Sequence, residues 1–138
     1  MMNLVTLGPG PGKQYLASQQ LASWFEASYF CNAHGMDLVT IETQDENDAL
    51  MNHIASIGQG ASFASGHMIG RTTYLWINGE YMQYADWAPG EPCCAEAYSC
   101  LILNMNDWHN FVCNIATYFI CEERILPFNF SSYKKSFV

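Results

Sequence analysis

Residues 23–47 have the sequence SWFEASYFCNAHGMDLVTIETQDEN, and they contain the signals that determine the fold. Ser23 and Glu26 are spaced as a capping box, in which each side chain bonds the backbone N–H of the other residue. A helix then runs to about His34, and Gly35 suits the left-handed position just past a helix end. The stretch therefore begins with a helix that has a signal at each end.

The second half of the stretch repeats this pattern. A short apolar segment, residues 38–41, predicts a strand, and Thr43 with Glu46 predicts a second capping box. The helix that follows is expected to end at Gly58 and to place three apolar residues on one face, namely Leu50, Ile54 and Ile57.

The rest of the chain predicts short strands and long loops. Asn78-Gly79 predicts a tight hairpin over residues 74–82, because both residues tolerate positive φ. Residues 88–99 have no helical or strand period and indicate a long loop. Further strands are expected around Phe63 and over residues 100–103, 110–113 and 118–121. Two helices followed by strands predict an α+β domain with small antiparallel sheets.

Composition excludes several classes of protein. The chain has 138 residues, a net charge of −8 and six cysteines. Nucleic-acid binding needs clustered Lys and Arg, which an acidic chain with one basic pair near its end does not provide. No apolar run approaches the roughly 20 residues that a membrane span needs.

The cysteines predict an oxidising, extracellular compartment, since no Cys-x-x-Cys pair favours a zinc site. The first residues have neither the basic segment nor the apolar stretch of a signal peptide. A breaker cluster, residues 8–12, predicts that residues 1–12 are a flexible segment. We expect one domain over residues 13–124 and a tail over residues 125–138.

Four stretches together resemble the C-type lectin-like family, over roughly residues 13–123. The first runs from Trp24 through Cys31 to Ile41, and the second is the helix entry Glu42-Thr43 with Asp45-Glu46-Asn47, similar to invertebrate members. The others are Trp87-Ala88-Pro89-Gly90-Glu91-Pro92 and the closing set Cys100, Trp108, Cys113 and Phe119-Ile120-Cys121-Glu122. The resemblance implies a disulfide-stapled fold with a long ligand loop.

The resemblance also implies the cysteine pairing, which the sequence alone leaves open among fifteen possibilities. Cys31 is expected to pair with Cys121, and Cys100 with Cys113. Adjacent Cys93 and Cys94 leave two outcomes open: a bond to each other, or a bridge to a second chain that makes a disulfide-linked dimer.

The ligand loop departs from the family pattern. Sugar-binding members hold calcium with a Glu-Pro-Asn segment, a Glu two places before a core cysteine, and an Asn-Asp pair after a Trp. Here Glu91 matches, but Cys93 and Tyr98 replace the second and third positions, and His109-Asn110 replaces the pair. Calcium prefers six to eight hard oxygens, so this sequence disfavours a calcium site.

Two alternatives for the metal stay open. Glu91, Cys93 and His109 are closer to a zinc set, which we treat as a hypothesis. Met105-Asn106-Asp107 could be a displaced Asn-Asp pair, although a turn before a strand is the favoured interpretation. The metal candidates are Glu91, His109 and Asn110. The ligand-binding candidates are Glu91, Cys93, Glu96, Tyr98, Trp108, His109 and Asn110.

The function indicated is a secreted recognition module, not an enzyme. The chain has no nucleophile elbow, no His-Glu-x-x-His and no phosphate-binding glycine loop. The long loop is expected to bind a carbohydrate or a protein, and the similarity to invertebrate members suggests an innate-immunity or reproductive-fluid role. The alternative is a calcium-independent protein-interaction module, or a disulfide-linked dimer, that binds no sugar.

Overall fold

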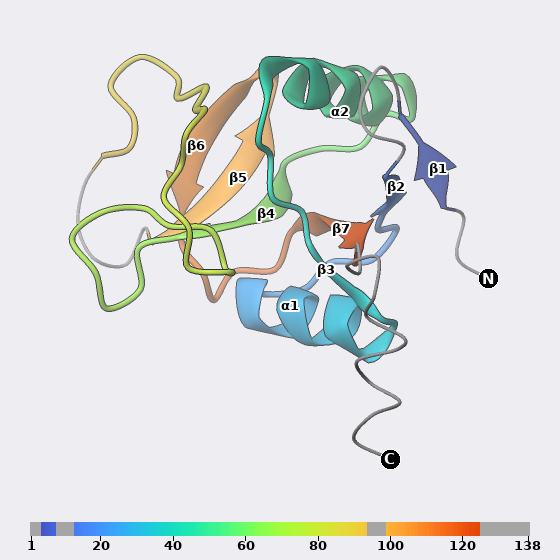
Figure 1. Ribbon diagram of the computed structural model, residues 1–138, viewed down its shortest axis with the longest axis horizontal. Helices are drawn as coiled ribbons and strands as arrows, with labels where there is room; N and C mark the ends of the chain where they lie inside the picture. Colours follow the sequence, from blue (N-terminus) through green and yellow to red (C-terminus); the bar gives the residue numbers. More distant parts are fainter. Residues whose placement is uncertain (1–3, 8–12, 94–98, 125–138) are drawn as a thin grey trace, which may run out of the picture.

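The computed structural model describes residues 4–7, 13–93 and 99–124. Within these ranges the chain forms two helices and one seven-stranded sheet of order β1-β2-β7-β4-β5-β6, with β3 also paired to β7. The elements are β1 (Val5–Thr6), β2 (Gln14–Ala17), α1 (Trp24–Ala33), β3 (Met36–Leu38), α2 (Gln44–Ser56), β4 (Ser62–His67), β5 (Cys100–Asn104), β6 (Asp107–Phe111) and β7 (Tyr118–Glu123). The helices lie on opposite sides of the sheet (Figure 1). The α+β prediction is confirmed, but the strands form one connected sheet in which β4 and β7 pair in parallel.

The first capping box is present in full. Ser23 accepts from the Glu26 backbone N–H at 3.1 Å, and the Glu26 carboxylate accepts from the Ser23 N–H at 3.0 Å. Gly35 follows the helix with a φ of 74°. The helix and its ends were therefore predictable from residues that are close in sequence.

The prediction of the second capping box was only half right. Thr43 accepts from the Glu46 backbone N–H, but the Glu46 carboxylate does not return to Thr43. It accepts from the Glu42 N–H at 2.9 Å and binds Lys13 instead. Ile57 caps α2 and is 43% exposed, so it does not face the core as predicted.

Lys13 stands at the centre of a buried polar group that we call the Lys13 cluster: Lys13, Tyr15, Glu46 and Glu122. The Lys13 Nζ lies 2.6 Å from Glu46 and 2.8 Å from Glu122, and the Tyr15 hydroxyl donates to Glu46. Burial raises the pKa of Glu122 to about 7, although the charge of Lys13 opposes the shift. The cluster connects β2 to α2 and β7.

Three strand predictions need correction. β3 ends at Leu38, although residues 39–41 are buried as expected and the Val39 N–H still donates to Ile120. β6 begins at Asp107 rather than residue 110, because Met105 and Asn106 take positive φ and form a two-residue turn. The pairing of Val5–Thr6 with β2 shows that the first 12 residues do not all lie outside the fold.

The predicted hairpin over residues 74–82 is present as a tight turn without regular strands. The Gly79 N–H donates to Trp76 at 2.8 Å, and the Trp76 N–H donates to Glu80 at 2.9 Å. Gly79 has positive φ but Asn78 does not, because its side chain accepts from the Glu80 N–H instead. Leu75 forms one isolated antiparallel bridge with His67 and another with Tyr81, instead of a continuous strand ladder.

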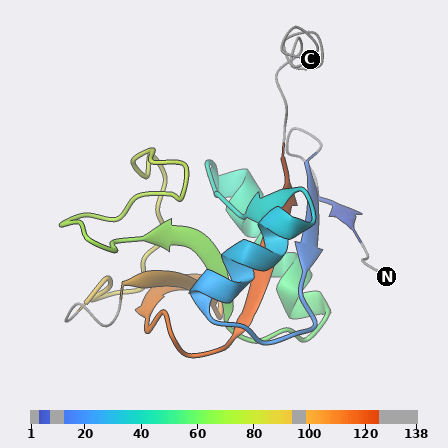
Figure 2. The ribbon, with the colours of Figure 1, turned by 90° about the horizontal axis from the view of Figure 1, so that it is seen from below.

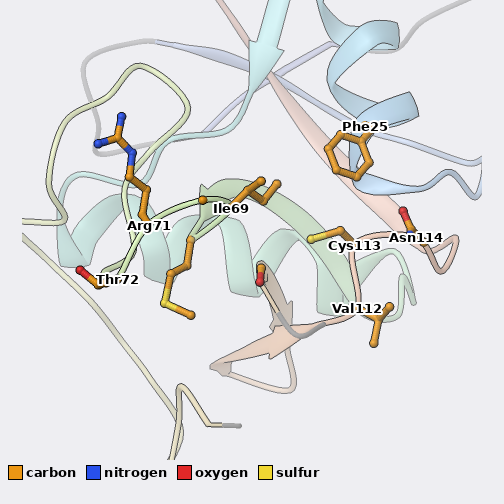
Figure 3. A pocket seen from close by; sticks show the side chains of 10 residues that line it. Phe25, Ile69, Arg71, Thr72, Val112, Cys113 and Asn114 are labelled. Carbon is orange, nitrogen blue, oxygen red and sulfur yellow. The ribbon is translucent and has the colours of Figure 1, made fainter. Parts of the chain in front are cut away.

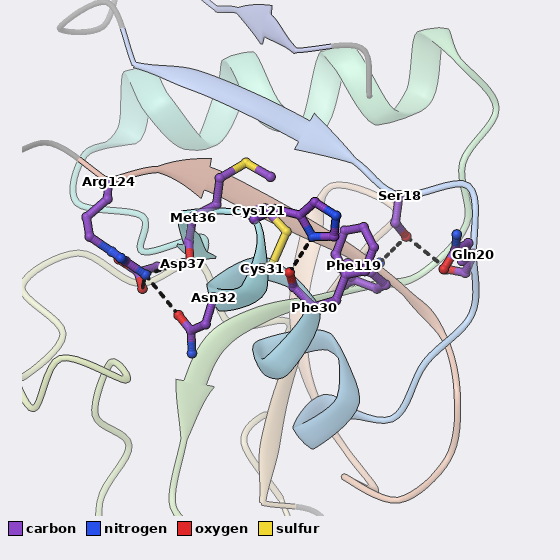
Figure 4. The surroundings of a disulfide bond; sticks show 11 residues. Ser18, Gln20, Phe30, Cys31, Asn32, Met36, Asp37, Phe119, Cys121 and Arg124 are labelled. Carbon is purple, nitrogen blue, oxygen red and sulfur yellow. Dashed lines mark hydrogen bonds and ion pairs between the residues drawn. A yellow bond between two sulfur atoms is a disulfide. The ribbon is translucent and has the colours of Figure 1, made fainter. Parts of the chain in front are cut away.

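Two hydrophobic clusters fill the space on either side of the sheet. One packs α2 against Trp76, Leu101 and Trp108, and the other packs α1 against Phe63 and Ile102. The Cys31–Cys121 disulfide (Figure 4) and the Cys100–Cys113 disulfide lie in the second cluster, which confirms the expected pairing. The first closes a separation of 90 residues, worth roughly 4 kcal/mol on the loop-entropy model.

In the part of the chain that the structure describes, neither helix is long and apolar enough to cross a membrane. Residues 8–12 and 125–138, to which the sequence assigns a linker and a tail, lie outside the described residues.

Candidate ligand site in the long loop

The candidate site lies in the chain between β4 and β5. This chain gathers on the side of the molecule away from β1 and β2, as two views at right angles show (Figures 1 and 2). The site candidates Glu96 and Tyr98 lie outside the described residues, as does Cys94.

Trp108 anchors this chain to the sheet. Its side chain is fully buried and makes edge-to-face contacts with Trp76, Tyr84 and Trp87, at centroid distances of 5.7 to 5.9 Å. The backbone of Trp108 donates to Asp86 and accepts from Ala88, both at 2.9 Å. A side chain with no exposed surface cannot touch a ligand. Trp108 therefore supports the loop, in contrast to the prediction that it contacts the ligand.

Asn47 of α2 completes this anchor, and sequence reasoning missed it. Its amide oxygen accepts from the Trp108 indole at 2.8 Å, and its amide nitrogen donates to Asp86 at 3.0 Å and to Tyr84 at 3.2 Å. Asn47 is 1% exposed, so its polar atoms must find partners inside the protein. No local pattern could have shown that these partners lie 37 to 61 positions along the chain.

The structure brings two of the candidate residues, Glu91 and Asn110, into contact. The Glu91 carboxylate accepts from the Asn110 backbone N–H at 2.8 Å, and the Asn110 amide donates to the Cys93 carbonyl. Asn110 is 8% exposed, and the Glu91–Pro92 peptide bond is cis. Burial raises the pKa of Tyr74, and the negative charge of Glu91 raises it further.

His109 does not join this group, contrary to the sequence prediction. Side chains alternate across a strand, and Trp108 and Asn110 pair with Leu103 and Leu101, which belong to the cluster under α2. His109 pairs with Ile102, which belongs to the cluster under α1. The His109 side chain therefore lies on the opposite face of β6 from those of Trp108 and Asn110. The strand boundaries would have revealed this, but the sequence placed the start of the strand at residue 110 instead of Asp107.

Cys93 is disulfide-bonded, so it has no thiolate to offer a soft metal ion. The zinc hypothesis needed Cys93 and His109 beside Glu91, and the structure supplies neither as a ligand. A bridge from Cys93 to a second chain would require this bond to be exchanged.

The described residues do not fit calcium either. One carboxylate is present, one of its oxygens already accepts a backbone N–H, and the Asn110 amide is turned to Cys93. Among the residues in described ranges, no group of three His, Cys, Asp or Glu side chains could hold a metal ion. Met105-Asn106 forms the β5–β6 turn and lines a hollow with Met51 of α2, so the displaced Asn-Asp interpretation is wrong.

A shallow hollow of about 310 Å³ lies next to the Glu91 turn and offers an aromatic surface. Tyr81 is 67% exposed there, and Trp87 is partly buried. The other residues that line it are Met68, Thr72, Thr73, Tyr74, Met82, Ala85 and Pro92.

The Lectin C-type domain family model matches residues 20–123. Perlucin of Haliotis laevigata is 27% identical over 123 residues, which cover 83% of this chain and 78% of perlucin. The human low affinity immunoglobulin epsilon Fc receptor is 26% identical over 104 residues, or 74% of this chain. The chain spans only about a third of the length of that receptor.

The fold agrees with a solved structure of the same class. The mouse scavenger receptor C-type lectin carbohydrate-recognition domain superposes with a TM-score of 0.77 and 21% identity, covering 87% of this chain and 96% of that one. This likeness supports the fold alone, because 21% identity is too low to infer a ligand from the other protein.

Proposed function

The chain belongs to the C-type lectin domain family, and from this we propose that it recognises its ligand through the long loop without a calcium ion. The family and its relatives indicate a ligand-recognition module, and no enzyme family is indicated. The proposal adds how the ligand is held: by direct contacts to protein atoms.

The hydrogen bonding of Glu91 carries the proposal. In a calcium-dependent site, oxygens from several side chains must remain available for the metal, which then takes the sugar hydroxyls as further ligands. Here the Glu91 carboxylate accepts from the Asn110 N–H at 2.8 Å, and the Asn110 amide donates to Cys93. These bonds satisfy the loop internally, so a ligand would not need to complete a metal shell.

The hollow beside the Glu91 turn supplies the contacts. Tyr81 and Trp87 present aromatic rings, Pro92 presents an apolar edge, and Thr72 and Thr73 add hydroxyls. Aromatic rings pack well on the apolar faces of sugars and on apolar protein side chains. The surface therefore suits a carbohydrate or a protein ligand.

A glycan array tests this proposal, run with calcium, with chelator and with added zinc. We expect the same glycans to be bound in all three conditions, and Tyr81→Ala to weaken binding about tenfold. Tyr29→Ala is the matched control, because Tyr29 is 76% exposed on α1. Binding that disappears in chelator would refute the calcium-free mechanism.

We also propose that the protein acts outside the cell, because its two described disulfides need an oxidising compartment to persist. A non-reducing gel checks the dimer that the sequence left open. The bonded state of Cys93 supports a monomer on that gel, and a band of twice the mass that disappears on reduction would show an interchain bridge.

A further inference from the structure

We propose that a second hollow, between α1 and the segment after β4, binds an acidic sugar such as a uronic acid. It lies beside the hollow of the proposed function and shares Met68 and Thr72 with it. The residues that would recognise the acid and the ring are different, so this inference does not depend on the proposed function.

Three segments that are distant in sequence form this hollow. They are the first turn of α1 at Phe25, the chain from Met68 to Thr72, and the turn from Val112 to Asn114. Arg71 and Phe25 stand at opposite ends, with Ile69 between them (Figure 3). The volume of about 580 Å³ is in the range that small-molecule sites occupy.

One end of the hollow is apolar and partly exposed. Phe25 is 49% exposed and Ile69 is 38% exposed, and Val112 also lines the hollow. The Phe25 ring is braced by Trp24, with centroids 5.4 Å apart and planes at 89°. A fixed, half-exposed aromatic ring is suited to packing against the C–H face of a sugar.

The other end carries the positive charge of Arg71. The described residues include three cationic side chains, and two of them are paired: Lys13 with Glu46 and Glu122, and Arg124 with Asp37. Arg71 has no ion pair within the described ranges, and no described residue that lines the hollow is acidic. An arginine guanidinium presents a planar fork of donors that matches a carboxylate.

The positive charge of Arg71 acts on the nearby imidazole of His67. Burial lowers the pKa of His67, and the charge of Arg71 lowers it further. The His67 Nδ1 accepts from the Ile69 N–H at 3.2 Å, which requires an unprotonated nitrogen at that position. Arg71 lines the hollow, so it is the cation that an acid entering the hollow would meet.

A sugar acid fits this arrangement better than an acidic peptide. The hollow combines a single cation, a single exposed aromatic ring and the hydroxyl of Thr72, which matches one acid group on one or two polar rings. An acidic peptide carries several charges along an extended backbone, and it would be expected to need a longer groove with more than one cation.

The experiment is a nuclear magnetic resonance titration of the intact protein with a disaccharide that contains one glucuronic acid. Its methyl ester is the matched neutral probe. We expect amide shifts to concentrate at residues 25, 69–72 and 112–114, and the ester to bind at least tenfold more weakly. Arg71→Gln should weaken binding of the acid at least tenfold, because a charge-assisted hydrogen bond is lost.

Two control variants make the result specific. Arg124→Gln removes an exposed cation on another surface and should leave binding unchanged, and so should Tyr81→Ala, which alters the neighbouring hollow. Thermal melts establish that each variant is folded. Equal binding of acid and ester, unchanged binding by Arg71→Gln, or shifts centred on residues 91 and 110 would overturn the proposal. So would Arg71-dependent binding of a short glutamate peptide when the sugar does not bind.

Discussion

Two regions of this molecule contain buried or partly buried carboxylates, and they balance the negative charge in different ways. In the Lys13 cluster, Glu46 and Glu122 surround a lysine that comes from the same chain, at 2.6 and 2.8 Å. In the long loop, Glu91 forms no ion pair with a described residue and accepts a backbone N–H at 2.8 Å. The first region is a closed ion cluster, and the second is a single hydrogen-bonded carboxylate.

The difference shows that this protein buries two carboxylates together where a lysine of the same chain is their ion-pair partner. Buried carboxylates without a counter-ion are costly, and a site that lacks both a lysine and a metal can keep few of them. The loop, in which Cys93, Tyr98 and His109 replace hard oxygen ligands, follows this rule. Four predictions test the contrast, beginning with the largest effect.

Removing the cation from the Lys13 cluster should have the largest effect. Lys13→Met leaves Glu46 and Glu122 without their partner in a buried site, so we expect a loss of about 3 to 5 kcal/mol in the free energy of unfolding. Urea denaturation at pH 8 measures it. Arg124→Met is the control, because the Arg124–Asp37 pair is exposed and should contribute only about 0 to 1 kcal/mol. Equal losses in the two variants would remove the distinction between a buried cluster and a surface pair.

The pH dependence of stability should identify Glu122. Its pKa is raised from 4.5 to about 7 in the folded state, so the folded protein retains a proton that the unfolded chain releases. The stabilisation from this group is complete below pH 4.5 and is lost as the pH rises through 7. The contribution is at most about 3 kcal/mol, at about 1.4 kcal/mol per pKa unit.

Urea midpoints at several pH values, compared between the wild type and Glu122→Gln, isolate this contribution from those of other carboxylates. We expect the difference between the two proteins to change between pH 4.5 and 7. A difference that is constant across this range would show that Glu122 titrates normally.

A second carboxylate in the loop should be less costly, and a metal should offset the cost. Asn110→Asp places a negative charge beside Glu91 and removes the amide donor to Cys93, so we expect a loss of about 1 to 2 kcal/mol in chelator. Millimolar calcium should restore part of it, because binding to the folded state stabilises that state. Asn110→Ala removes the donor without adding charge, so calcium should not restore it.

Calcium should have the smallest effect on the unmodified protein. Because Glu91 is the one carboxylate in described residues 88–93, we expect the melting temperature to be the same in calcium and in chelator. Differential scanning calorimetry in the two buffers makes the comparison. A rise of several degrees with calcium would mean that the loop binds the ion despite its altered ligands.

The elements that depend on neighbouring residues were predictable. The Ser23–Glu26 box, the left-handed Gly35 and the turn at Gly79 follow from contacts within a few residues. The disulfides followed from the family resemblance, because the cysteine positions matched its pattern. Errors of one to three residues at β3 and β6 arose where apolar segments continue past the ladder or where a turn is tighter than expected.

The candidate site was predictable only in part. Glu91 contacts Asn110, but Trp108 is a buried anchor and His109 faces the other side of β6 from Asn110. Sequence spacing can identify which residues are near each other in a loop. It shows which way a side chain points only when the strand boundaries are known.

The sequence by itself determined the family, the two helices and the cysteine register, because these depend on local hydrogen bonds and on residue spacing. The tertiary structure alone decided the charge balance. Glu46 leaves its expected cap partner for Lys13, 33 positions earlier in the chain, and the Asn110 N–H reaches Glu91 across 19 positions. Electrostatic energies depend on distance and burial, and both are set only when distant segments come together.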